Sequence, residues 1–185
     1  MVNTASVVAI FEFEVYLLMT MKIRMVNKKA TVLEAKLAEY GFSVSDAERI
    51  HAQMTETLGD KTSRFETLKK LLGAGQDSTS LTYSSVLWPE FDFNATGEGG
   101  LLASARYWHV RGHSPTVHLP TELPAWSIDI TEFTQYFGPM TDGDQWSLFD
   151  KLLPGYEEYQ FEWQGTRYGA AFSWGLFLFA AEFWE

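Results

Sequence analysis

Residues 168–181, YGAAFSWGLFLFAA, form an uncharged and strongly apolar segment that restricts how the chain can fold. Fourteen residues are too few for a membrane-spanning helix, which needs about 20. Gly169 and Gly175 would weaken any helix in this segment. The residues before it alternate between apolar and polar, and Gly165 permits a tight turn between the two stretches. We therefore predict a hairpin whose second strand is buried on both faces.

Residues 11–25 show a second regular pattern, in which the odd positions are all apolar and the even positions include charged residues. A period of two predicts a strand with one buried face. Fifteen residues are many for one strand, so we expect it to bend or to contain a bulge. A helix would scatter the charged residues around its whole circumference.

Capping patterns predict three short amphipathic helices after this strand. They place the helices at residues 31–40, from Ser45 to Gly59, and from Asp60 or Thr62 to Gly73. Further elements are predicted as strands at 81–87, 90–93 and 101–110 and as helices at 130–137 and 145–153. The fold class that follows is α+β, with an antiparallel sheet of N-terminal and C-terminal strands and the three short helices packed on one face.

The length of the chain fits a single domain that covers residues 1–185. Residues 73–78 are rich in glycine and polar side chains and form the best linker candidate. A subdivision into residues 1–75, a strand plus helices, and residues 76–185, an acidic, aromatic-rich and β-rich part, is therefore also possible.

The negative charge is concentrated in the second of these parts. Residues 1–75 contain ten Lys and Arg against nine Asp and Glu, whereas residues 76–185 contain four against fifteen. All seven Trp also lie in residues 76–185. This excess of carboxylates would repel nucleic acid and anionic membranes and favours a cationic partner.

The composition also bears on the cellular compartment. The chain contains no cysteine, which excludes disulfides and thiolate metal sites and fits a reducing cytoplasm. Glu12 and Glu14 interrupt the apolar stretch that a signal peptide would require. We expect a cytoplasmic protein.

The sequence contains no recognisable catalytic or cofactor motif. Ser173 lacks the first glycine of a nucleophile turn. The carboxylate pairs are expected in turns or at strand ends, where water would keep both groups ionised and unsuited to general acid–base catalysis. We therefore expect a non-enzymatic protein that uses no cofactor and has no catalytic residue.

Three histidines provide an alternative, a small metal-dependent hydrolase that uses His109, His113 and His118. Imidazole is the commonest zinc ligand, but this spacing matches no established metal motif. On a strand, His109 and His113 would lie about 13 Å apart, too far to share one metal unless the chain folds back at Gly112.

The best functional signal is the interleaving of acidic and aromatic residues in three stretches of the second part. Aromatic rings provide anchors in protein interfaces, and carboxylates steer and select a basic partner. The partner-binding residues predicted in this way are Glu90, Asp92, Asp142, Asp144, Trp146, Tyr156, Glu157 and Glu158.

We therefore expect an acidic binding or inhibitor protein that occludes a basic protein partner, such as a nuclease or a toxin. In size and charge the chain is comparable to immunity proteins, antitoxins and phage-encoded inhibitors. A second alternative is a ligand- or sugar-binding module that uses exposed Trp side chains.

Overall fold

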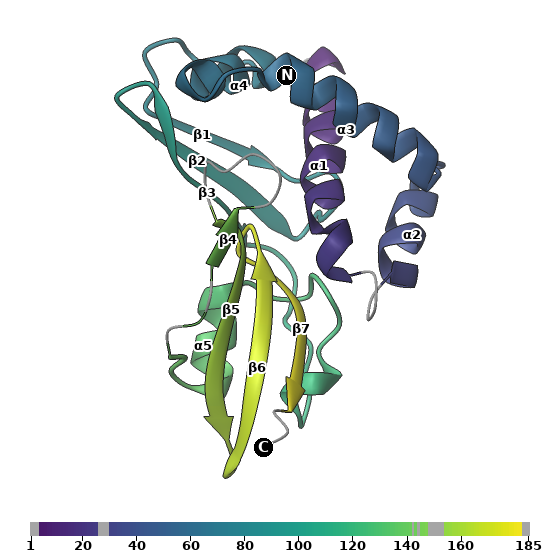
Figure 1. Cartoon of the computed structure of the whole chain (residues 1–185), viewed down its shortest axis with the longest axis vertical. Coiled ribbons are helices and arrows are strands. Elements are labelled where there is room, and N and C mark those ends of the chain that lie inside the picture. The colour runs from purple at the N-terminus through teal and green to yellow at the C-terminus, as the bar shows by residue number, and fades with distance from the viewer. Residues whose placement is uncertain (1–3, 26–29, 142, 144, 148–153, 183–185) are drawn as a thin grey trace.

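The computed structural model describes residues 4–25, 30–141, 143, 145–147 and 154–182 and shows an α+β protein (Figure 1). Its helices are α1 (Thr4–Met25), α2 (Ala30–Glu39), α3 (Val44–Leu58), α4 (Arg64–Leu72) and α5 (Ile130–Phe137), with short 3-10 turns η1 (Lys61–Ser63) and η2 (Pro120–Glu122). Its strands are β1 (Ser80–Ser84), β2 (Phe91–Glu98), β3 (Leu101–His109), β4 (Gln145–Ser147), β5 (Pro154–Trp163), β6 (Thr166–Ser173) and β7 (Leu176–Glu182). They form two antiparallel sheets, sheet A in the order β1-β2-β3 and sheet B in the order β4-β5-β6-β7.

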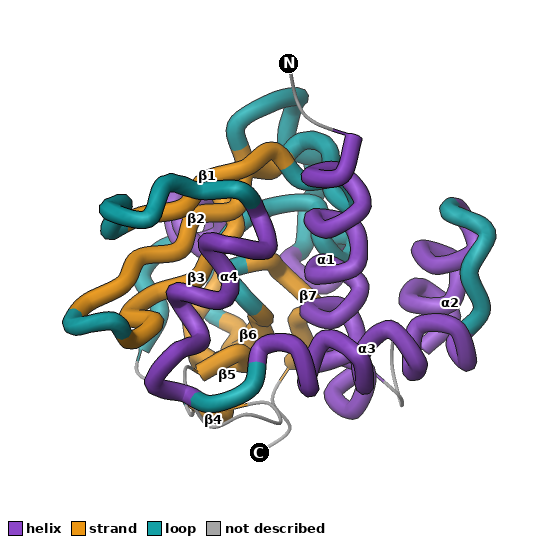
Figure 2. Tube along the Cα trace, turned by 90° about the horizontal axis from the view of Figure 1, so that it is seen from above, coloured by secondary structure: helices purple, strands orange, loops and turns teal. Residues whose placement is uncertain are grey.

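The strand expected over residues 11–25 is wrong, because these residues lie in α1. Residues 13–21 are all buried, and Figure 2 shows α1 between sheet A and the helices α2 and α3. A helix surrounded by protein has no polar face, so an amphipathic period does not reveal it. Three of the polar side chains at even positions, those of Glu14, Thr20 and Lys22, have partners within the protein. Lys22 forms an ion pair with Glu48 at 2.6 Å, and the Thr20 hydroxyl donates to the Leu17 carbonyl.

The remaining N-terminal helices lie close to their predicted positions. Gly73 ends α4 in the left-handed conformation, with φ 72°. The N-cap of α3 is Ser43 rather than Ser45. The Ser43 hydroxyl accepts from the Asp46 amide at 3.1 Å, and the Asp46 carboxylate accepts from the Ser43 amide at 3.0 Å. This reciprocal pair satisfies two of the free amides at the start of the helix.

Sheet A packs its inner face against the helices. The inner-face residues of one cross-strand row are Tyr83, Phe93 and Tyr107. Phe13 of α1 contacts the Phe93 ring edge-on, with 5.6 Å between ring centroids. On the same sheet, a Cβ added to Gly97 would lie 2.2 Å from Cδ1 of Phe65, so α4 rests directly on the backbone of β2.

Sheet B contains the apolar run 168–181, which lies in β6 and β7. The prediction that this run is buried strand is therefore confirmed. The predicted turn at Gly165 joins β5 to β6. A second turn at Trp174 and Gly175, missed in the sequence, divides the run. Both of its residues have positive φ, 51° and 81°, as in the type I′ turns that suit the twist of a hairpin.

The helix expected at residues 145–153 is not present where the structure describes this stretch. Residues 145–147 form β4, which pairs with β5, and residues 148–153 lie outside the described residues. A three-residue strand has too few positions for its period to be recognised in a sequence.

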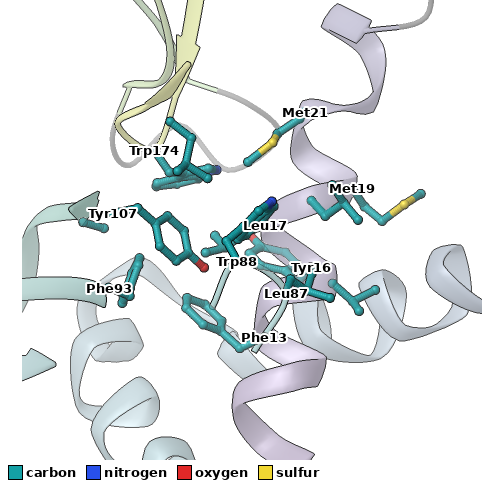
Figure 3. Packing of buried hydrophobic residues seen from close by; sticks show 14 of the residues in the cluster. Phe13, Tyr16, Leu17, Met19, Met21, Leu87, Trp88, Phe93, Tyr107 and Trp174 are labelled. Carbon is teal, nitrogen blue, oxygen red and sulfur yellow. The ribbon is translucent and has the colours of Figure 1, made fainter. Parts of the chain in front are cut away.

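The described residues form two hydrophobic cores. The first contains residues of the four helices α1, α2, α3 and α4, of sheet A and of one end of sheet B. It includes residues from both sides of the predicted linker at 73–78. Figure 3 shows Phe13, Leu17 and Met21 of α1 near Phe93, Tyr107 and Trp174. The second core lies between α5 and sheet B, and Phe133 is at its centre.

Among the helices of the described residues, none is both long enough and apolar enough to cross a membrane.

Candidate functional site

Pairing of β4 with β5 brings together predicted site residues from two separate stretches of sequence. Trp146 lies opposite Tyr156, and Gln145 lies opposite Glu157. Trp146, which was expected in a helix, is therefore a neighbour of Tyr156 in one sheet.

The side chains of β5 divide between two faces. Phe161 belongs to the core against α5, together with the partly buried Tyr159 and Trp163. The intervening positions face the other side of the sheet, where Gln160 and Glu162 are exposed and Glu158 is half-buried. We call Glu158, Gln160 and Glu162 the β5 outer face.

Two of the predicted partner-binding residues are buried, so the expectation of accessible side chains there is wrong. Tyr156 is 1% exposed, and its hydroxyl donates to Oε1 of Glu158. The Glu157 side chain is 5% exposed and forms an ion pair with Nη2 of Arg106 at 3.1 Å. Both residues lie where β5 enters the junction between the two sheets, and this junction depends on tertiary contacts that strand alternation does not report.

The structure leaves part of the predicted site undescribed. Asp142 and Asp144 lie outside the described residues, and of Trp146 only the backbone pairing is described. A bridge between Thr141 and Gln160 lies along the same edge of β5 that pairs with β4.

Asp92 lies at the start of β2 in sheet A, and Glu90 directly precedes this strand. The Glu90 side chain is 54% exposed, and its Oε2 lies 3.6 Å from Nε2 of His109. Asp92 accepts a hydrogen bond of 2.6 Å from Nη2 of Arg111, which also donates to the Phe91 carbonyl. Asp92 is therefore neutralised by a guanidinium, and Glu90 is the more accessible carboxylate.

Trp108, which is not among the predicted site residues, is the exposed ring of this region. It is 41% exposed and lies opposite Asp92 in the β2–β3 register. Alternation along residues 101–110 contained the signal, because Tyr107 points to the core and the next residue must then point outward.

The structure does not assemble the three histidines. His109 lies at the end of β3 with a side chain that is 5% exposed, whereas His113 and His118 are exposed. No group of three or more His, Asp or Glu side chains could hold a metal ion within the described residues. The geometry gives the metal-hydrolase alternative no support.

His109 instead joins β3 to the start of α5. Its Nδ1 lies 2.7 Å from Oε1 of Glu132, and its backbone amide donates to Oδ2 of Asp129 at 2.8 Å. Ser114 also donates to Oε1 of Glu132, at 2.7 Å. Asp129 and Glu132 form the capping box of α5, so this cluster has a structural role in holding the two sheets together. The spacing of Asp129 and Glu132 marks the helix start in the sequence, but their contact with His109 is tertiary.

This cluster should stabilise the fold above acidic pH. Burial raises the pKa of the Glu132 carboxyl, but hydrogen bonds from His109, Ser114 and the Asp129 amide outweigh burial and leave this pKa below its ordinary value of 4.5. Ionised Glu132 therefore contributes stability above pH 4.5 that is lost as the pH falls through the lowered pKa. We expect the difference in unfolding free energy between wild type and Glu132→Gln to shrink as the pH falls in this window. Urea titrations at a series of pH values measure it, and a constant difference would contradict this role.

A second buried polar cluster centres on Glu14 of α1. Its Oε2 accepts from the amides of Val86 and Leu87, both at 2.8 Å, and its Oε1 accepts from the Tyr107 hydroxyl at 3.0 Å. Burial raises the pKa of this carboxyl, and hydrogen bonds, the largest from Ser85, offset the rise only in part. Glu14 ties α1 to sheet A and to the turn that follows β1.

Comparison with protein-family models, with curated proteins and with solved structures finds no match for this chain.

Proposed function

We propose that the chain is a non-enzymatic acidic binding protein that occludes a basic protein partner, such as a nuclease or a toxin. The observation that supports this best is the alternation along β5, in which Glu158 and Glu162 lie on the side of the strand away from the core against α5. The β5 outer face lies on the side of sheet B opposite α5 (Figure 1). We therefore propose the β5 outer face as the contact surface.

The charge balance of this half of the protein supports a cationic partner. Its described cations already face carboxylates. Arg106 pairs with Glu157, Arg111 pairs with Asp92, and Arg167 lies opposite Glu162 in the β5–β6 register. Residues 76–185 contain four Lys and Arg against fifteen Asp and Glu, so most carboxylates of this part have no matching positive charge in its composition. Such an imbalance accelerates encounter with a positively charged surface.

Charge reversal on the β5 outer face tests this proposal. We expect the double variant Glu158→Lys, Glu162→Lys to lose the basic proteins that the wild-type chain captures from a lysate of its native host at low salt. The reason is that two reversed carboxylates turn attraction into repulsion, and screening by about 0.5 M salt should abolish wild-type capture as well. The captured proteins are identified by mass spectrometry.

The matched control carries the same change of charge on the helices, Glu34→Lys with Glu56→Lys. Both residues are exposed on α2 and α3, so this variant keeps the net charge of the test variant but leaves the β5 outer face intact. The proposal is wrong if no basic protein is enriched by the wild-type chain, or if both variants lose it equally.

A further inference from the structure

The outward face of sheet A carries three cross-strand rows of polar side chains and one exposed ring. The first row is Ser84, Asp92 and Trp108, the second is Thr82, Asn94 and Arg106, and the third is Ser80, Thr96 and Ser104. Each of these side chains is at least partly exposed. We call the first two rows the polar face of sheet A. It is distinct from the β5 outer face, which belongs to sheet B.

Neighbouring groups hold the polar side chains of this face in place. The Asn94 amide nitrogen donates to the Thr82 hydroxyl at 2.8 Å. Arg106 is fixed by the buried carboxylate of Glu157, and Asp92 is fixed by Arg111. A ligand would therefore meet donors and acceptors that are already oriented, which lowers the entropy cost of binding.

The charges of the polar face are balanced locally, although the protein as a whole is acidic. Two guanidiniums, those of Arg106 and Arg111, face two carboxylates, those of Glu157 and Asp92. A phosphate or a cationic side chain would have to displace one of these ion pairs. A neutral ligand rich in hydroxyl groups can instead form hydrogen bonds with the partly exposed side chains of Asp92, Asn94 and Arg106 while both ion pairs stay in place.

From this arrangement we propose that the polar face of sheet A binds a neutral sugar ring, stacked on the Trp108 indole. A pyranose has an apolar C–H face that matches the broad, rigid surface of an indole, and hydroxyl groups at its edge. Asp92 lies opposite Trp108, Asn94 lies diagonal to it, and Arg106 precedes it by two residues on the same strand. Their planar side chains supply both donors and acceptors for those hydroxyls. This combination of one exposed ring with planar polar groups defines the chemical class of the ligand.

Calorimetric titration of the full chain with three neutral oligosaccharides, cellohexaose, maltohexaose and chitohexaose, tests the proposal. We expect at least one of them to bind, and we expect its affinity to change little between about 0.05 and 0.5 M salt because the ligand carries no charge. The variant Trp108→Ala should bind it about tenfold more weakly or worse, as expected when a stacking ring is removed. Trp108→Phe, which keeps a smaller ring, should lose less.

The control variant is Tyr136→Ala, which removes an exposed ring from α5 and should bind as wild type does. The proposal is overturned if none of the three sugars binds the wild-type chain, or if Trp108→Ala binds as tightly as wild type. The test is independent of the basic-partner proposal. The Glu158→Lys, Glu162→Lys variant should retain sugar binding, so either proposal can fail without the other.

Discussion

Replacement of Glu14 by methionine should lower the free energy of unfolding at pH 5 by about 2–4 kcal/mol. Methionine keeps the length and the helix propensity of the side chain but offers no acceptor. The amides of Val86 and Leu87 then lose their partner, and each unsatisfied buried donor costs about 1–3 kcal/mol. The Tyr107 hydroxyl loses Glu14 but keeps the Tyr83 hydroxyl at 3.4 Å. Equilibrium denaturation in guanidinium chloride, followed by circular dichroism, measures the loss.

The matched variant Glu14→Gln separates hydrogen bonding from charge. Its carbonyl can accept from the two amides, and its NH2 group can donate to the Tyr107 oxygen, so most of the hydrogen bonds survive. The raised pKa of Glu14 means that its stabilising contribution is fully present below pH 4.5 and is lost as the pH rises through that raised value. The stability of Glu14→Gln relative to wild type should therefore improve with rising pH. Equal stability of the Met and Gln variants at all pH values would show that the hydrogen bonds accepted by Glu14 do not stabilise the fold.

Replacement of Phe133 by alanine should lower the unfolding free energy by about 3–5 kcal/mol, the largest effect expected for a single residue here. Phe133 is fully buried at the centre of the second core. Its ring meets those of Phe161 and Phe172 edge-on, at centroid distances of 5.1 and 5.3 Å, and stacks on Phe177 at 5.4 Å. Alanine would leave a cavity enclosed by β-strands that cannot collapse into it. Chemical denaturation followed by far-UV circular dichroism gives the change.

Tyr136→Ala serves as the control on the same helix. This residue is 52% exposed, so its replacement should change stability by no more than about 0.5 kcal/mol. A Phe133 variant that is no less stable than the Tyr136 variant would mean that α5 does not cover sheet B as described.

Local signals in the sequence located most elements correctly. The helix predicted at residues 130–137 has the bounds of α5, because its capping residues and its hydrophobic period agree. The Gly99–Gly100 pair, with positive φ at both residues, marks the hairpin between β2 and β3. Such signals depend on residues close together in the chain, and these are the features that a single sequence reports.

Helix α1 shows why other elements escaped prediction. Its charged residue Glu14 lies inside the protein, where amides 72 and 73 residues away in the sequence satisfy it. No pattern within residues 4–25 indicates those partners. The same limit applies to the candidate site, because alternation placed Glu158 and Glu162 on an outer face but could not show that Glu157 is buried against Arg106.

The turn at Trp174 and Gly175 has a consequence for biosynthesis. The Trp174 carbonyl accepts from the Tyr107 amide at 2.8 Å, and its indole donates to the Thr20 hydroxyl of α1, 154 residues earlier. During translation, α1 leaves the ribosome long before the residues that complete its surroundings are made. Until β6 and β7 have been synthesised, the apolar surface of α1 must therefore be covered by the segments made before them or by a chaperone. Truncated chains that lack this hairpin should be prone to aggregate.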